Sequence, residues 1–113
     1  MSYRNLRVLE AAEEMVVNVV ALFDEPRPRS QRLLFKGQTI GCAEAVPANI
    51  GEAFGRKTTA DRNRVLAIAC GEAEETIRHL KANLSANRLD ERSYWPLHNR
   101  LVTIVKMLKS MIN

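Results

Sequence analysis

The stretch from Val46 to Arg56 places a proline inside an otherwise continuous amphipathic helical pattern, and this pattern ends at Gly55. A proline in a helix interior removes one backbone hydrogen bond and crowds the preceding turn, which costs about 3 kcal/mol. Pro47 lacks the N–H that would bond the carbonyl of Ala43, so we expect a kink at this point of the helix. The sequence therefore predicts a long, bent helix with other helices packed around the bend.

The composition favours helices over strands. The chain has 113 residues, which is enough for one domain with a single core. Hydrophobic residues make up 46% of the chain and aromatic residues only 5%, so the core must be mainly aliphatic. No segment alternates cleanly between apolar and polar residues, and no Asn-Gly or Asp-Gly hairpin turn occurs. These features predict one all-α domain over residues 1–113.

Prolines and cap residues define the first two predicted helices. The first covers about residues 5–23 and ends before Pro26 and Pro28, because two prolines so close together stop a helix. The second begins at Ser30, a suitable N-cap, and runs to about residue 54. Gly55 is expected at the position just beyond its end, where glycine is common.

Two further helices are predicted in the second half of the chain. The third begins at residue 58 or 59 with a pattern that resembles a capping box, and it ends at a turn over residues 85–89. The fourth begins after Asp90 or after Ser93. We favour Ser93 as the start of regular helix, because Pro96 then lies in the first turn, where its missing N–H costs little.

Apolar residues repeat at intervals of three and four in these segments, which indicates helices with one buried face. In the first helix the predicted face contains Leu6, Leu9, Met15, Val16, Val19 and Phe23. Four helices joined by short turns favour an antiparallel up-down-up-down bundle. The apolar faces of the first and fourth helices are wider than one bundle seam requires, which indicates a subunit interface.

Charge and cysteine content exclude few classes of protein. The net charge is +4, with 17 Lys and Arg spread along the chain, so binding to a polyanion is permitted but not required. Cys42 and Cys70 lie in apolar settings without metal-binding spacing, and we expect them to be reduced thiols. Because we find neither a signal peptide nor a membrane-spanning run, we expect a cytoplasmic protein without membrane association.

The densest basic cluster lies around the turn between the second and third predicted helices and consists of Arg56, Lys57, Arg62 and Arg64. One interpretation is that these side chains contact phosphates of a nucleic acid. The alternative, which we favour slightly, is that they are solvated and paired with Asp61 and other acids. Arg4 and Arg7 are expected nearer to the opposite end of the bundle.

Asn49 and Glu52 lie one turn apart, just after the predicted kink. They form either a polar site or a structural pair. In the structural interpretation, which we favour, Asn49 bonds the carbonyl that Pro47 leaves free, and Glu52 pairs with an arginine across the bundle.

No catalytic, metal-binding or cofactor-binding motif is present. His79 and His98 both lack the Glu three residues earlier that a carboxylate-bridged metal pair in a bundle requires. There is no glycine-rich phosphate loop and no nucleophile elbow. Tyr94 and Trp95 are expected to be core or interface anchors. We therefore expect a protein that is not an enzyme and binds neither metal nor cofactor.

Two segments resemble a known bacterial family. The opening, from Tyr3 to Val8, is similar to the Tyr-Arg-Asp-Leu-x-Val opening of the 23S rRNA intervening-sequence proteins, which are four-helix bundles. The stretch 46–56 resembles their signature Ile-Pro-Ser-Asn-Ile-Ala-Glu-Gly-Phe-Gly-Arg, and residues 64–71 are also similar. The signature residues, to which we assign a structural role, are Pro47, Asn49, Glu52, Phe54, Gly55 and Arg56.

The resemblance implies a left-handed four-helix bundle assembled into a ring-like homopentamer. A related pentameric bundle is the accessory protein of a retroelement reverse transcriptase and binds nucleic acid. This sequence departs from the family pattern at three places. Leu9 replaces a frequent Trp, Ile40 and Gly41 replace an arginine pair, and Gly51 to Ala53 permute the Ala-Glu-Gly of the signature. The loss of the arginine pair weakens a role in nucleic-acid binding.

From these features we expect a non-enzymatic, oligomeric binding or scaffold protein. Its partners would be other copies of itself, as a pentamer, and RNA or a nucleic-acid-processing enzyme. The alternative is a purely structural homo-oligomer that binds another protein and has no affinity for nucleic acid. The missing arginine pair at Ile40 and Gly41 favours this alternative.

Overall fold

The computed structural model describes residues 2–113, which contain four long helices, one short 3₁₀ helix and no strands. The long helices are α1 (Tyr3–Asp24), α2 (Lys36–Phe54), α3 (Thr59–Ser85) and α4 (Glu91–Met111), and the 3₁₀ helix is η1 (Arg29–Gln31). The prediction of an all-helical chain with four helices is therefore confirmed.

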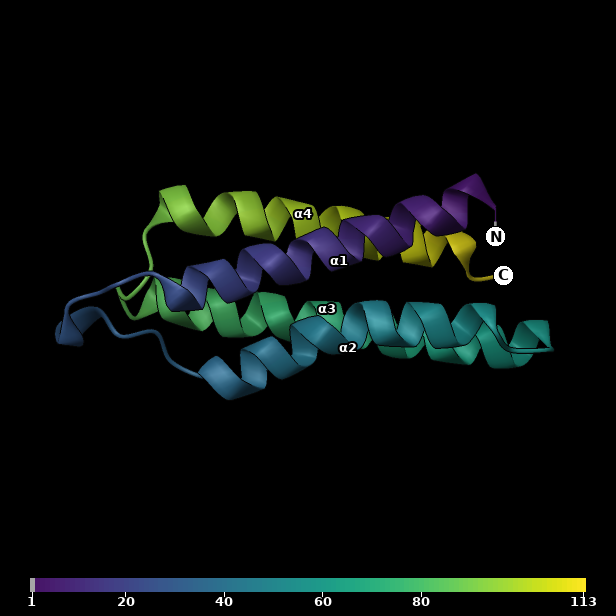
Figure 1. Cartoon of the computed structure of the whole chain (residues 1–113), viewed down its shortest axis with the longest axis horizontal. Helices are drawn as coiled ribbons and strands as arrows, with labels where there is room; N and C mark the ends of the chain where they lie inside the picture. The colour runs from purple at the N-terminus through teal and green to yellow at the C-terminus, as the bar shows by residue number, and fades with distance from the viewer. Residues whose placement is uncertain (1) are drawn as a thin grey trace.

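The four long helices lie side by side in an elongated bundle of 49 × 21 × 19 Å (Figure 1). α1 packs against α2 and α4, and α3 packs against the same two helices. Both termini and the α2–α3 turn lie at one end of the bundle, whereas the connection from α1 to α2 and the α3–α4 turn lie at the other (Figure 1). Successive helices thus run in opposite directions, as predicted, although the connection from α1 to α2 covers residues 25–35 and is longer than the predicted short turn.

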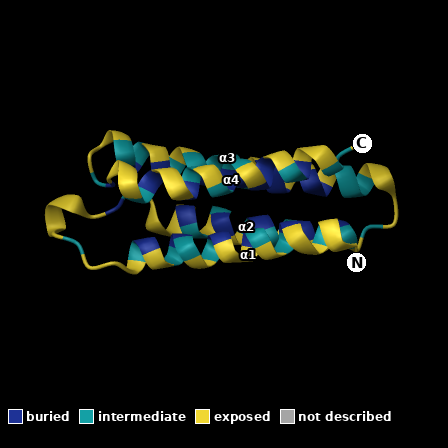
Figure 2. Cartoon of the chain, turned by 90° about the horizontal axis from the view of Figure 1, so that it is seen from above, coloured by how far each residue is buried: buried dark blue, intermediate teal, exposed yellow. Residues whose placement is uncertain are grey.

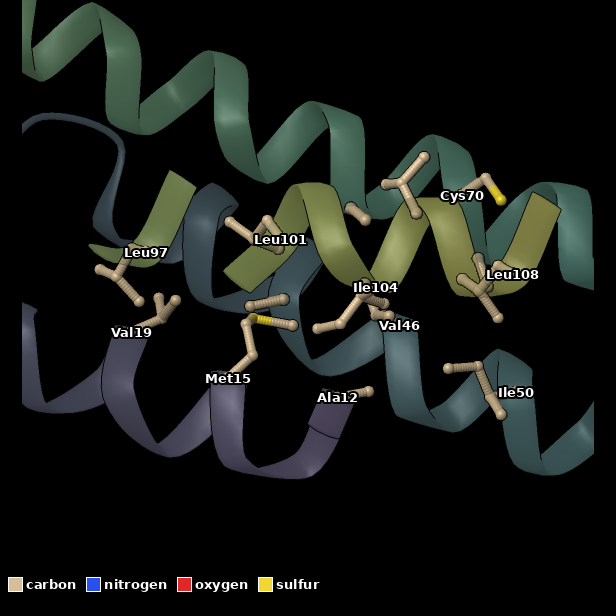
Figure 3. Packing of buried hydrophobic residues seen from close by; sticks show 14 of the residues in the cluster. Ala12, Met15, Val19, Val46, Ile50, Cys70, Leu97, Leu101, Ile104 and Leu108 are labelled. Carbon is tan, nitrogen blue, oxygen red and sulfur yellow. The ribbon is translucent and has the colours of Figure 1, made fainter. Parts of the chain in front are cut away.

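An aliphatic core fills the space between the four helices, while the exposed residues lie outside (Figure 2). Figure 3 shows Met15 and Val19 of α1 facing the side chains of α4, among them Leu101 and Ile104. All four are fully buried. Burial of a side chain of this size contributes about 1.5–3 kcal/mol, so this seam supplies much of the stability of the bundle.

The predicted buried face of α1 was partly wrong. The buried residues are Val8, Ala12, Met15, Val19 and Leu22, whereas Leu6 is 43% exposed. α1 carries apolar side chains around more than half of its circumference, so periodicity alone could not locate the centre of the buried face. The structure places that centre on the side that includes the small Ala12, which allows the neighbouring helices to approach closely.

Helix α2 begins at Lys36, later than predicted, and Ser30 lies in η1 instead of capping α2. Three features of the preceding segment prevent an earlier start. Leu33 is buried in the core, and the backbone N–H of Leu34 donates to Oδ1 of Asn83 at 2.7 Å. Phe35 adopts a left-handed conformation with φ of 63°, which no helix can continue through.

The preferred start of the fourth helix was also wrong, because Asp90, not Ser93, is its N-cap. The Asp90 carboxylate accepts a hydrogen bond of 2.8 Å from the backbone N–H of Ser93. Pro96 then lies in the second turn and leaves the carbonyl of Arg92 without a helical partner. Since Arg92 is exposed, water can bond this carbonyl and the proline is tolerated.

The caps and polar contacts around α2 and α3 confirm some predictions and correct others. Thr58 is the N-cap of α3 and accepts from the N–H of Asp61 at 3.1 Å, as predicted.

Pro47 lies inside α2, and a kink there stays a prediction. Asn49 donates to the carbonyl of Ala45, one turn back, because that of Ala43 is too far along the helix. Gly55 is the C-cap with φ of −89°, a conformation open to any residue.

Candidate nucleic-acid interface

The four predicted basic residues lie together at the α2–α3 turn. Arg56 hydrogen-bonds the Glu52 carboxylate at the end of α2, and its Nη1 lies 3.3 Å from Oδ2 of Asp61 on α3. Arg64 donates from Nε and Nη2 to Oδ1 of the same Asp61, at 3.1 and 2.9 Å. Arg56 and Arg64 therefore share Asp61. Arg56 fastens the end of α2 to the start of α3, whereas Arg64 pairs with Asp61 within the first turns of α3.

Lys57 and Arg62 differ from these two residues, because neither has an ion-pair partner within residues 2–113. Lys57 is exposed in the turn, and Arg62 is half-buried on the first turn of α3. Of the four predicted residues, these two carry uncompensated positive charge. They are consequently the better candidates for phosphate contacts.

Arg4 and Arg7 lie at this same end, which corrects the expectation that they lie near the opposite one. In an up-down bundle α1 starts where α2 ends, and Figure 1 shows the N-terminus beside the α2–α3 turn. Arg4 and Arg62 line one pocket of about 270 Å³ together with Phe54. Arg4 also hydrogen-bonds Oγ of Ser110 on α4, so the pocket joins residues from all four helices.

Charge is segregated along the bundle. We define the basic end as the α2–α3 turn together with the six residues of each long helix nearest to it. Its basic side chains are Arg4, Arg7, Arg56, Lys57, Arg62, Arg64, Lys106 and Lys109. Its acidic side chains are only Glu52 and Asp61. The middle of the bundle is acidic, with Glu10, Glu13, Glu14, Glu44, Glu72, Glu74 and Glu75 against Arg78 and Arg100.

This segregation gives the basic end a strongly positive surface on a chain of modest net charge. Charges within about a Debye length of one another, roughly 8 Å in physiological salt, act together on a ligand. Sequence reasoning missed Arg4, Arg7, Lys106 and Lys109 as members of this surface. The signal that would have found them is the bundle topology, which brings the two chain ends to the α2–α3 turn.

Three signature residues belong to the structure of the basic end. Glu52 pairs with Arg56, four residues later in the chain. The predicted partner is therefore an arginine, as expected, but it does not lie across the bundle. Phe54 is the last residue of α2 and lines the pocket of Arg4 and Arg62. These contacts indicate that these three signature residues stabilise the α2–α3 turn.

The histidines and cysteines do not form a metal-binding or reactive site in the part of the chain that the structure describes. Within residues 2–113 no group of three His, Cys, Asp or Glu side chains is placed to hold a metal ion. Glu75 lies 3.1 Å from Nε2 of His79, on whose ring Phe35 stacks. Cys42 and Cys70 are free, and burial raises the pKa of both thiols, which keeps them protonated and unreactive at neutral pH.

The two aromatic residues of α4 form one cluster with His98 but differ in burial. Tyr94 is 1% exposed, and its hydroxyl oxygen lies 2.9 Å from Nδ1 of His98, so it is a core anchor as predicted. Trp95 is 44% exposed and contacts the ring of His98 edge-on.

None of the helices in residues 2–113 has the length and apolarity needed to cross a membrane.

The family model of the 23S rRNA-intervening sequence protein matches residues 4–110. The chain belongs to this family. A solved structure of an S23 ribosomal protein family member of unknown function, from Bacteroides thetaiotaomicron, is also similar. It is 26% identical with a TM-score of 0.87, and the match covers 96% of this chain and 97% of that chain. None of the curated proteins matches this chain.

Proposed function

We propose that this member of the 23S rRNA-intervening sequence protein family is a non-enzymatic, oligomeric scaffold that binds RNA through its basic end. The observation that carries the proposal is the segregation of charge along the bundle. At the basic end, Glu52 and Asp61 are the only acidic side chains beside eight basic ones. Both acids are already engaged by Arg56, so they add little repulsion toward a phosphate. The expected setting is the cytoplasm.

Phosphate contacts supply most of the sequence-independent affinity of a protein for nucleic acid. Lys57, Arg62 and Arg4 are suited to this role because they have no acidic partner in residues 2–113. Arg56 holds the turn in place through Glu52 and Asp61, Arg64 pairs with the same Asp61, and both arginines add their charge to the local potential. An RNA backbone laid across this end would meet residues from all four helices.

We further propose that the chain assembles through α1 and α2, as the ring-like homopentamer that its resemblance to the family implied. Val17 of α1 is 66% exposed and Leu6 is 43% exposed, and both point away from the core. On α2, Gly41 and Gly51 are exposed, and a methyl group added at either would meet no atom. Such a surface allows a second helix to approach closely, and a ring would repeat each basic end and raise its affinity by multivalency.

The experiment that tests RNA binding is a titration of the protein with a structured RNA over a range of salt concentrations. Binding is expected to weaken as salt rises, because released counterions drive it. Replacement of Lys57 and Arg62 by Ala should lower the slope of the logarithm of affinity against salt by about 2, since each lost phosphate contact lowers it by about 1.

The matched control removes two arginines from the acidic middle, Arg78→Ala and Arg100→Ala, and should leave binding at or only slightly below that of the unaltered protein. Equal losses in both variants would mean that net charge alone drives binding. Absence of binding even at low salt would overturn the proposal. It would leave the alternative, a structural homo-oligomer whose partner is another protein.

A further inference from the structure

The connection from α1 to α2 is a long loop, residues 25–35, at the end opposite to the termini (Figure 1). Two arginines tie it to the α3–α4 turn. Nη1 of Arg27 donates to the carbonyl of Arg88 at 2.9 Å, and Nη1 of Arg88 donates to the carbonyl of Arg32 at 2.8 Å. Asn83 of α3, which is fully buried, bonds both backbone groups of Leu34. A loop held at so many points is a preorganised element.

This loop and the adjoining ends of α1 and α2 line an open pocket of about 590 Å³. Pockets that bind small molecules are typically about 300–1,000 Å³, so its size suits a ligand of that class. Its lining contains the apolar side chains of Phe23, Pro28 and Leu33. Arg29 and Arg32 line it as well. We name this cavity the loop pocket.

The loop pocket has an excess of positive charge. Besides Arg29 and Arg32 it is lined by Lys36 and Arg27, against the one acid Glu25. Glu25 pairs with Arg27 at 3.6 Å, so it compensates only that arginine.

The other three cations are exposed and have no acidic partner in residues 2–113. Arg27 also lines the loop pocket, and its Nε is buried without an acceptor among the described residues. Three unpaired cations beside an apolar lining form a surface that attracts an anion.

We propose that the loop pocket binds a short segment of single-stranded nucleic acid. Arginine and lysine side chains bind the phosphates, while a base packs on the apolar lining and on the guanidinium planes, as in other single-strand sites. A duplex does not fit, because its bases are stacked inside and cannot reach the concave lining. The site shares no residue with the basic end, so it does not rest on the function proposed above.

The test is an NMR titration of the backbone amides with an unlabelled trinucleotide of uridine at low salt. The proposal expects concentration-dependent shifts at residues 27–36, with loss of these shifts in the double variant Arg29→Ala and Arg32→Ala. Both side chains are exposed, so the variant should keep its fold and its other amide positions. The matched control, Lys57→Ala with Arg62→Ala, should keep the shifts at residues 27–36.

A parallel titration with an abasic trinucleotide, which has the same sugar-phosphate backbone and charge but no bases, separates the contribution of the bases from that of the phosphates. The uridine trinucleotide is expected to bind at least tenfold more tightly at equal salt. Equal affinity would overturn the nucleotide assignment, since the apolar lining would then contribute nothing. Shifts confined to residues 56–64 would overturn the loop pocket while supporting the basic end. Shifts confined to residues 27–36 support the loop pocket and leave the basic end to the titration with structured RNA.

Discussion

Asn83 shows how a single buried side chain shapes this molecule. Its amide group accepts from the N–H of Leu34 at 2.7 Å and donates to the carbonyl of Leu34 at 3.1 Å. The remaining amide hydrogen reaches the carbonyl of His79, one turn back on α3. A buried amide is stable only if its hydrogen bonds are made, and here they hold a loop residue against a helix.

We therefore expect Asn83→Ala to destabilise the protein by about 2 kcal/mol, because the backbone groups of Leu34 lose their partners in a partly buried position. Urea unfolding followed by circular dichroism measures this change. The control is Asn99→Ala on the exposed side of α4, which should be close to neutral. If the two variants unfolded at the same urea concentration, the proposed anchoring role of Asn83 would be wrong.

At the scale of whole elements, local signals located some helix ends and missed others. The prolines at 26 and 28 and the cap at Thr58 set the end of α1 and the start of α3, since each acts through neighbouring residues only. The start of α2 depends on contacts of Leu34 with Asn83, which is 49 residues away in the sequence. No pattern in residues 30–36 carries this information, so the prediction failed there.

The start of α4 provides a test of capping at the level of the helix. The N–H of Ser93 donates to the Asp90 carboxylate and holds its pKa below the ordinary value of about 3.9. A carboxyl group with a lowered pKa in the folded state stabilises the fold at neutral pH. This contribution is lost as the pH falls from the unfolded-state pKa through the lower folded-state pKa.

Asp90→Ala should therefore lower stability at pH 7 and have little effect at pH 2, where the carboxyl is protonated. Asp90→Asn is the matched control, because asparagine also caps helices but does not titrate in this range. Thermal unfolding between pH 2 and pH 7 measures both variants. A difference between Asp90→Ala and the unaltered protein that did not change with pH would contradict a role for the charge.

At the scale of the whole molecule, topology creates surfaces that no local pattern shows. The cluster around residues 56–64 is visible in the sequence, because its members are close along the chain. Its extension by Arg4 and Lys109 exists only because antiparallel helices bring both chain ends to the α2–α3 turn (Figure 1). The loop pocket likewise needs the fold, since Phe23 and Lys36 meet there only when α1 and α2 turn back on each other.

The exposed apolar face of α1, which contains Leu6 and Val17, makes no contribution to the core of a monomeric bundle. Val17 is 66% exposed, so its replacement removes little from the core, and Val17→Lys should leave the helical content of the chain unchanged. If this face joins copies of the chain, a lysine there buries an unpaired charge in each contact and should convert the oligomer to smaller species. Light scattering after size-exclusion chromatography, with protein at micromolar concentration, measures this change.

The control for Val17→Lys is Ala67→Lys, which places the same charge on an exposed position of α3. It should leave the assembly intact, because α3 does not carry the exposed apolar face of α1. Dissociation in both variants would mean that added positive charge, rather than the α1 face, breaks the assembly. A monomer in the unaltered protein would remove the assembly proposal altogether, and RNA binding would then depend on the single basic end.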